Sequence, residues 1–234
     1  MQVTEQGPAS RAEQLTHTRP AVERWLIWSG SIPLPAFLLL HISRELALSF
    51  SSDVSEVVRP VPGVAGVLSS VALVWLPLAL HAGLGVWLLL RQAGQRPSGN
   101  APSHARADTG WLPRRVSQVT SLLALAFLLY HAREYPLSVA LGESDPSDVG
   151  FILLARLSAT SYGVPLRSFV YLLGLAATVT HASLGMHRGL LLEGYLRREA
   201  SRRTSERVCA GAGALLFGLG AAAVIRVASG VLLH

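Results

Sequence analysis

The stretch from Leu76 to Arg91, LPLALHAGLGVWLLLR, places a histidine in the middle of a segment that a lipid bilayer would accept. A similar stretch, TVTHASLGMHRGLLL, returns around His181, and both contain the sequence His-Ala-x-Leu-Gly. An imidazole in the centre of an apolar helix costs free energy to bury. One such histidine alone is more often a hydrogen-bonded packing residue than a ligand. Two matching histidines, each followed by a glycine four residues later, need a common explanation.

The composition is typical of an integral membrane protein rather than of a soluble domain. Half of the 234 residues are hydrophobic, only 15% are charged, and the mean hydropathy is +0.41. The single cysteine, Cys209, excludes an intrachain disulfide and a metal site built from several cysteines. Residues 1–20 are polar and lack the apolar core of a signal peptide.

The apolar segments predict an all-α bundle of five transmembrane helices. About 20 apolar residues cross the hydrocarbon core as a helix, and five such segments lie at roughly 25–50, 64–90, 116–135, 168–192 and 208–233. The sequence therefore divides into a cytoplasmic segment, 1–24, and a five-helix membrane domain, 25–234. Prolines inside the first two spans are compatible with this, because neighbouring helices can satisfy the freed carbonyls.

The arginines indicate the orientation of the bundle. They gather in the N-terminal segment and in the loops 91–115 and 188–207, while the two opposite loops are richer in acidic residues. By the positive-inside rule the N-terminus is cytoplasmic and the C-terminus lies outside. The outer loop, 136–167, contains VGFILLARLSATSYG, which is too short to span and is expected to form an amphipathic helix in the interface.

Four histidines stand one on each of the first four predicted spans. With a helical rise of 1.5 Å per residue, His81 and His181 lie about 15 and 10 Å from the arginines at the cytoplasmic edge. His41 and His131 lie roughly 24–26 Å from that edge. The four therefore form two pairs at two depths, His81 with His181 and His41 with His131.

Bis-histidine haem b fits such pairs, because two imidazoles at one depth can clamp a flat cofactor from both sides. Gly85 and Gly185 share a helix face with His81 and His181, where a side chain would press on the porphyrin. Two haems at two depths form an electron path across the membrane.

Haem propionates need cationic or hydrogen-bonding partners, preferably arginine. Arg44 and Arg133 follow the two outer histidines and are candidates on that side. Arg24 and Gln118 are candidates on the cytoplasmic side, for a propionate or for a quinone.

The sequence resembles the dihaem cytochrome b membrane-anchor subunit of succinate:quinone oxidoreductases, of the single-chain five-helix type. The resemblance covers nearly all of the chain beyond residue 20 and rests on GSIPLPAFLLLHI, LPLALHAGLGVW, VTSLLALAFLLYHAREY and VYLLGLAATVTHASLG, the stretches that contain the four histidines. It implies that His81 and His181 hold the proximal haem iron and that His41 and His131 hold the distal one. The chain departs from the family at Gln118, where relatives carry an arginine.

The resemblance implies a membrane anchor and electron-transfer subunit of succinate dehydrogenase or fumarate reductase, in the bacterial cytoplasmic membrane. Such a subunit does not itself act on succinate. It exchanges electrons between a cytoplasmic iron–sulfur subunit, which is joined to a flavoprotein, and menaquinone or ubiquinone, and it binds no nucleic acid.

Two other functions remain open from the residues alone. One is the cytochrome b subunit of another quinone-linked complex, of the nitrate reductase, hydrogenase or formate dehydrogenase type, although such subunits tend to draw their ligands from fewer helices. The other is a transporter with a histidine proton relay. A relay predicts acidic side chains beside the histidines, and spans two and four contain none.

Overall fold

The computed structural model describes residues 21–50, 68–93, 111–143, 149–160 and 163–229. These residues form helices joined by short connections, with no strand among them. Four of the described helices are long and apolar enough to cross a membrane: Trp25–Ala47, Leu68–Arg91, Leu166–Leu192 and Glu199–Ala228. The prediction of an all-α, multi-pass membrane protein is confirmed at this level.

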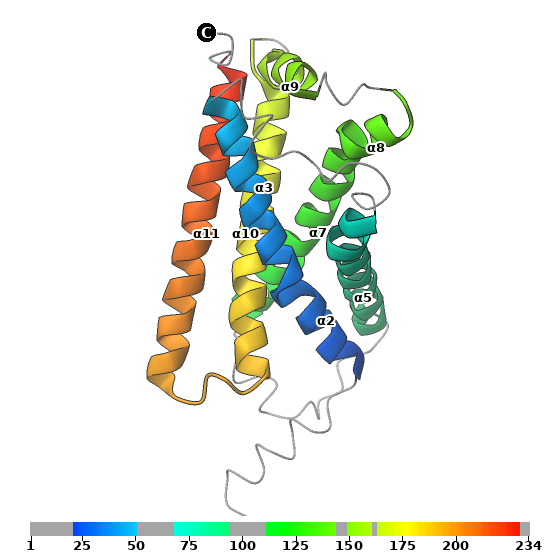
Figure 1. Ribbon diagram of the computed structural model, residues 1–234. Helices are drawn as coiled ribbons and strands as arrows, with labels where there is room; N and C mark the ends of the chain where they lie inside the picture. Colours follow the sequence, from blue (N-terminus) through cyan, green and yellow to red (C-terminus); the bar gives the residue numbers. More distant parts are fainter. Residues whose placement is uncertain (1–20, 51–67, 94–110, 144–148, 161–162, 230–234) are drawn as a thin grey trace, which may run out of the picture.

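Helices α2 and α3 run upward one after the other in Figure 1, and the long helices that follow run alternately down and up along the same axis. Their bounds are α2 Ala21–Ser31, α3 Pro33–Phe50, α5 Leu76–Ala93, α7 Trp111–Glu134, α10 Leu166–Leu192 and α11 Glu199–Ala228. Helix α10 packs against α7, α11 and α2, whereas α5 packs mainly against α2. Two short helices, α8 (Pro136–Ala140) and α9 (Val149–Ser158), lie at the upper end in Figure 1. Helix α9 is the helix expected in the loop 136–167.

Proline explains two irregularities in the first spans. The helix is interrupted at Ile32, between α2 and α3, where Pro33 and Pro35 remove two backbone donors. A π-helical turn, η2 (Val71–Trp75), precedes Pro77, and the Leu76 N–H bonds to the Val71 carbonyl instead of to the one four residues back.

Helix α7, the third predicted span, is not among the four most apolar helices. Its 24 residues are long enough to cross a bilayer, but its first half carries several hydroxyl groups. The hydroxyl of Thr120 donates to the Val116 carbonyl at 2.8 Å, and that of Ser121 donates to the Gln118 carbonyl at 2.8 Å. These bonds lower the cost of placing the hydroxyls in an apolar environment.

Two helices extend beyond the predicted apolar spans at their N-terminal sides. Helix α11 begins at Glu199, well before residue 208, because its polar first turns also favour a helix. Glu199 accepts a hydrogen bond from Arg203 Nε at 3.0 Å, one turn later, and its charge is favourable at a helix N-terminus. Similarly, α2 begins at Ala21, inside the segment assigned to 1–24.

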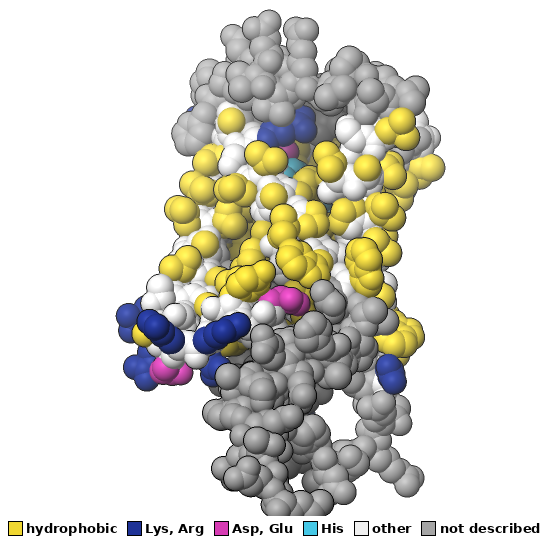
Figure 2. Space-filling view, turned by 60° about the horizontal axis from the view of Figure 1, so that its bottom comes forward, with side chains coloured by type: hydrophobic (Ala, Val, Ile, Leu, Met, Phe, Trp, Pro, Cys, Tyr) yellow, Lys and Arg dark blue, Asp and Glu magenta, His cyan; other side chains and the backbone are white. Residues whose placement is uncertain are grey.

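Buried side chains are concentrated in the upper half of the bundle. One cluster joins α7, α9, α10 and α11 through Tyr135, Leu157, Tyr171 and their neighbours, and a second joins α3, α10 and α11 around Ile42. By contrast, hydrophobic side chains cover most of the middle of the face drawn in Figure 2. No residue of the apolar window in Leu68–Arg91 is buried within the chain. Such a surface is suited to lipid or to a partner subunit.

Glycines allow α10 and α11 to approach closely. A Cβ placed on Gly213 would overlap the side chain of Ser183, and one on Gly220 would lie 2.6 Å from Leu175 Cδ2. Small residues at such positions are the usual means of tight helix packing in membranes. This contact fixes α10, which carries His181.

Candidate functional site

The structure brings the four histidines together as two separate pairs. The ring centroids of His81 and His181 are 6.0 Å apart, with an interplanar angle of 59°. Those of His41 and His131 are 5.7 Å apart, with an angle of 62°. Each pair joins two helices that are distant in sequence, α5 with α10 and α3 with α7. We call them the inner pair (His81, His181) and the outer pair (His41, His131).

In the inner pair, His81 is held by the backbone of α2. Its Nδ1 lies 3.1 Å from the Leu26 carbonyl, and the Ser29 hydroxyl lies 3.5 Å from the same nitrogen. A carbonyl can only accept, so Nδ1 carries the proton and Nε2 keeps its lone pair. A metal-ligating histidine commonly makes this hydrogen bond with its other nitrogen.

Gly30 makes the position of His81 possible. A Cβ added at Gly30 would overlap the imidazole of His81, so only glycine leaves space for the ring against α2. This residue was missed by the sequence analysis. Gly30 and His81 lie on different helices, and no local pattern connects them.

The other inner histidine, His181, is only partly satisfied. Its Nδ1 is buried and has no hydrogen-bond partner. A Cβ at Gly185, one turn later, would meet nothing within 4 Å, and one at Gly85 would meet only Leu26 Cδ1, at 4.0 Å. Neither position is crowded by a neighbouring helix, and Gly185 is exposed.

In the outer pair, each histidine is stacked on a phenylalanine one turn earlier. Phe37 lies 5.3 Å from His41 between ring centroids, at 9°, and Phe127 lies 5.8 Å from His131, at 26°. A Cβ at Gly174 of α10 would overlap the Phe127 ring, so this glycine lets α7 and α10 close around it. The shared spacing, Phe-x-x-x-His, was the available sequence signal for both phenylalanines.

The outer pair also has carboxylates near it. His41 Nδ1 lies 3.8 Å from Glu45 Oε1. His131 Nδ1 lies 3.3 Å from the Tyr171 hydroxyl, which in turn donates to Glu134 Oε2 at 2.9 Å. The inner pair has backbone carbonyls and hydroxyls instead, so the two sites differ in charge.

Each histidine pair has one buried polar atom without a hydrogen-bond partner in it or beside it. Among the described residues these atoms are His181 Nδ1 in the inner pair and the Tyr135 hydroxyl beside the outer pair. The ring centroids of Tyr135 and His131 are 5.5 Å apart. Buried polar atoms are rarely left unsatisfied, so a bound group that supplies a partner fits both places.

The predicted propionate and quinone residues are only partly near the pairs. Arg133 is exposed, and its guanidinium group makes a bidentate ion pair with Glu143, at 2.7 and 3.1 Å. Arg44 is exposed one turn after His41, and Gln118 is partly buried on α7 next to Ser117. Arg24 lies in α2, but its side chain is outside the described residues.

Two arginines that the sequence analysis did not single out lie close to Glu134, beside the outer pair. Arg156 of α9 and Arg167 of α10 each place Nη1 3.9 Å from Glu134 Oε1. Arg156 also donates to the Glu134 carbonyl at 2.9 Å. Their approach depends on how α9 folds back over the bundle, which no local pattern shows.

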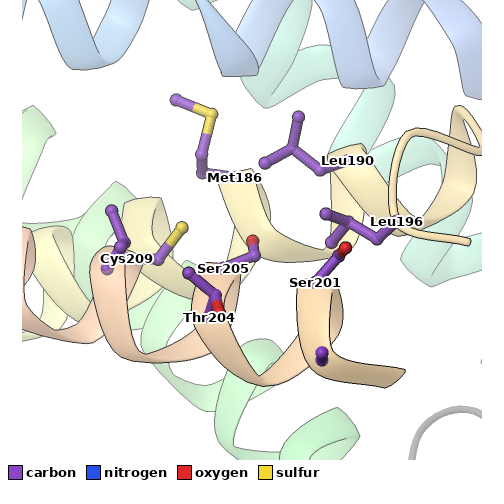
Figure 3. A pocket seen from close by; sticks show the side chains of 9 residues that line it. Met186, Leu190, Leu196, Ser201, Thr204, Ser205 and Cys209 are labelled. Carbon is purple, nitrogen blue, oxygen red and sulfur yellow. The ribbon is translucent and has the colours of Figure 1, made fainter. Parts of the chain in front are cut away.

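A hollow of about 540 Å³ lies between α10 and α11, apart from both pairs. Figure 3 shows Met186 and Leu190 of α10 facing Thr204, Ser205 and Cys209 of α11 across it. Its lining includes none of the four histidines. The histidine pairs therefore remain the candidate site.

The fold and the site together define a class: a multi-pass helical membrane protein in which two pairs of histidines meet between long helices. A comparison of the chain with known protein families, curated proteins and solved structures gave no match.

Proposed function

We propose that the chain is a dihaem cytochrome b that anchors a succinate:quinone oxidoreductase and conducts its electrons. The observation that carries this proposal is the two imidazole pairs, 6.0 and 5.7 Å apart between centroids, on apolar helices. His81 and His181 would hold one haem iron and His41 and His131 the other. Each bound haem supplies a one-electron carrier.

The distances support ligation of a single iron by each pair. Bonds from imidazole nitrogen to a metal are about 2 Å long, so two rings on opposite sides of one ion have centroids roughly 6 Å apart. The interplanar angles of 59° and 62° are compatible, because each ring can rotate about its own metal bond.

The number of ligands favours haem over a bare metal ion. In the part of the chain that the structure describes, no three His, Cys, Asp or Glu side chains form a metal-binding group. Two imidazoles are too few for a structural or catalytic zinc site. They complete the coordination of a haem iron, whose other four ligands belong to the porphyrin.

The two pairs are separated along the same helix. On α10, Tyr171 contacts the outer pair and His181 belongs to the inner pair. Their ten-residue separation corresponds to about 15 Å along the axis. Two carriers at two levels would connect the two sides of the membrane.

The proposed topology has five spans, with α7 as the third, and a cytoplasmic N-terminus. The connection between α10 and α11 and the first turns of α11 support this orientation, because Arg197, Arg198, Arg203 and Arg207 are exposed there. Figure 2 shows dark-blue side chains gathered at the corresponding end. This end would receive the iron–sulfur and flavoprotein subunits.

A proton-translocating transporter is less well supported. Its relay would need titratable partners at both levels. Among the described residues, carboxylates approach only the outer pair: Glu45 at 3.8 Å from His41, and Glu134 through Tyr171. His81 instead lies against a backbone carbonyl and a hydroxyl. The cytochrome b subunit of another quinone-linked complex would have different partners, and such subunits tend to draw their haem ligands from fewer helices than the four that carry these histidines.

Absorption spectroscopy and haem assay of the purified full chain test the proposal. We expect a b-type α-band on reduction, two haems per polypeptide by pyridine haemochrome, and no reaction with carbon monoxide, because each iron has two protein ligands. Succinate-reducible haem in the isolated complex would separate the proposed enzyme from other quinone-linked complexes.

His187→Ala is a matched control for the histidine variants. His187 lies on α10 like His181, but its Nδ1 is 3.0 Å from the Ser205 hydroxyl and it belongs to neither pair. It should keep both haems. A chain that folds in the membrane and contains no haem contradicts the proposal.

A further inference from the structure

Glu134, at the end of α7, is a nearly buried carboxylate held by groups from three helices. Its side chain is 11% exposed. The hydroxyl of Tyr130 donates to Oε1 at 2.8 Å and that of Tyr171 donates to Oε2 at 2.9 Å. Arg156 and Arg167 each lie 3.9 Å from Oε1. Two hydroxyl groups and two guanidinium groups thus fix the orientation of the Glu134 side chain.

Only one of the two tyrosines continues to a histidine. The Tyr171 hydroxyl donates its hydrogen bond to Glu134. It can therefore only accept a hydrogen bond from His131 Nδ1, which lies 3.3 Å away. His131 Nδ1 must then be the donor, and Nε2 is left without a proton. The result is a directed chain of hydrogen bonds from His131 through Tyr171 to Glu134.

We propose that Glu134, acting through the Tyr171 hydroxyl, is the positioning residue that fixes His131 and makes it an electron-rich ligand of the outer haem. This inference rests on the proposed function. A ligating imidazole whose second nitrogen donates toward a carboxylate is more basic and is fixed in tautomer and ring orientation. A more basic ligand favours oxidised over reduced iron and therefore lowers the midpoint potential of the haem.

The other three histidines do not have such a chain. His81 Nδ1 donates to a neutral backbone carbonyl, and His181 Nδ1 has no hydrogen-bond partner. His41 Nδ1 is 3.8 Å from Glu45 Oε1, which is too long for a hydrogen bond. The effect should therefore be confined to one ligand of one haem.

The two tyrosines supply a matched pair of variants. Tyr171→Phe removes the link between His131 and Glu134, whereas Tyr130→Phe removes a bond to the same carboxylate without touching His131. Glu134→Gln removes the charge and keeps both tyrosines. The readouts are the midpoint potentials of the two haems in the purified full chain and the electron paramagnetic resonance signal of each oxidised haem.

We expect Tyr171→Phe and Glu134→Gln to raise the midpoint potential of the outer haem and to change its resonance signal. Tyr130→Phe should leave both at the wild-type values, and the inner haem should be unchanged in all three variants. If Tyr171→Phe does not fold, Glu134→Gln decides, because it is nearly isosteric and leaves the hydroxyl in place.

Two results would overturn the inference while leaving the proposed function intact. One is a dihaem protein whose outer potential is the same in wild type, Tyr171→Phe and Glu134→Gln. The other is an equal shift in Tyr130→Phe, which would show a general effect of the Glu134 charge. A chain that binds no haem would overturn both the inference and the proposed function.

Discussion

The imidazoles of His81 on α5 and His181 on α10 face each other at 6.0 Å between ring centroids, although they belong to helices far apart in sequence. Helix α5 has few other contacts with α10, because it packs mainly against α2. The contact between His81 and His181 therefore helps to hold α5 against α10. A group bound between the rings would add to this link, and its loss should loosen α5.

Substitution of Gly30 should disturb the inner pair alone. A Cβ at Gly30 overlaps the His81 ring, and overpacking of this kind costs about 1–3 kcal/mol, enough to displace the imidazole. We expect Gly30→Ala to lose inner haem and keep outer haem, measured as haem per polypeptide with a redox titration. The control is Gly83→Ala, where a Cβ would meet nothing within 4 Å. Equal loss of both haems would show that the glycine acts on the whole fold.

Gly174 should matter for the outer pair in the same way. A Cβ there overlaps Phe127, which stacks on His131. Gly174→Ala should lower stability by about 1–3 kcal/mol, measured by denaturant unfolding in micelles, and should alter the outer haem spectrum. Gly218→Ala, which adds a Cβ in open space on α11, should do neither. If Gly174→Ala is destabilised but its outer haem spectrum is unchanged, the packing of Phe127 against Gly174 does not affect the outer haem.

The two outer arginines should differ in their contribution to stability. Arg133 and Glu143 are both exposed, at 57% and 45%, so Arg133→Gln should change stability by less than about 1 kcal/mol. Arg156 is less exposed and donates to the Glu134 carbonyl, so Arg156→Gln should cost more, about 1–3 kcal/mol. Unfolding of both variants under the same conditions measures the difference. Loss of outer haem in Arg133→Gln would instead support its expected role at a propionate.

Partner subunits should dock at the arginine-rich end. Complementary charge speeds and orients the association of a basic surface with an acidic partner. We expect crosslinks from the iron–sulfur subunit to the loops 91–115 and 188–207, and weaker association at high salt. Charge reversal at Arg203 and Arg207 should slow association. Crosslinks confined to 136–167 would mean that the proposed orientation is wrong.

Regular periodicity made much of the fold predictable. The apolar segments and the helical rise were sufficient to locate the long helices and to pair His81 with His181 and His41 with His131, the pairs whose rings meet in the structure. The short helix α9 was also expected from its length and pattern. These features depend on local sequence and on distance along a helix axis.

Features that depend on contacts between helices were not predictable from the sequence. The need for Gly30 arises from α5 lying against α2, and the approach of Arg156 to Glu134 arises from the position of α9. The early start of α11 was missed because its first turns are polar and the apolar pattern begins only later in the helix. Arg133 was expected at the site because it follows His131, but its partner, Glu143, lies beyond α8.

Redox titration of the single variants His81→Ala and His181→Ala tests the central claim most directly. If the two imidazoles clamp one iron, both variants should lose the same haem and keep the other at its wild-type midpoint potential. His41→Ala and His131→Ala should form a second class that lacks the other haem. Loss of different haems by His81→Ala and His181→Ala would contradict the account.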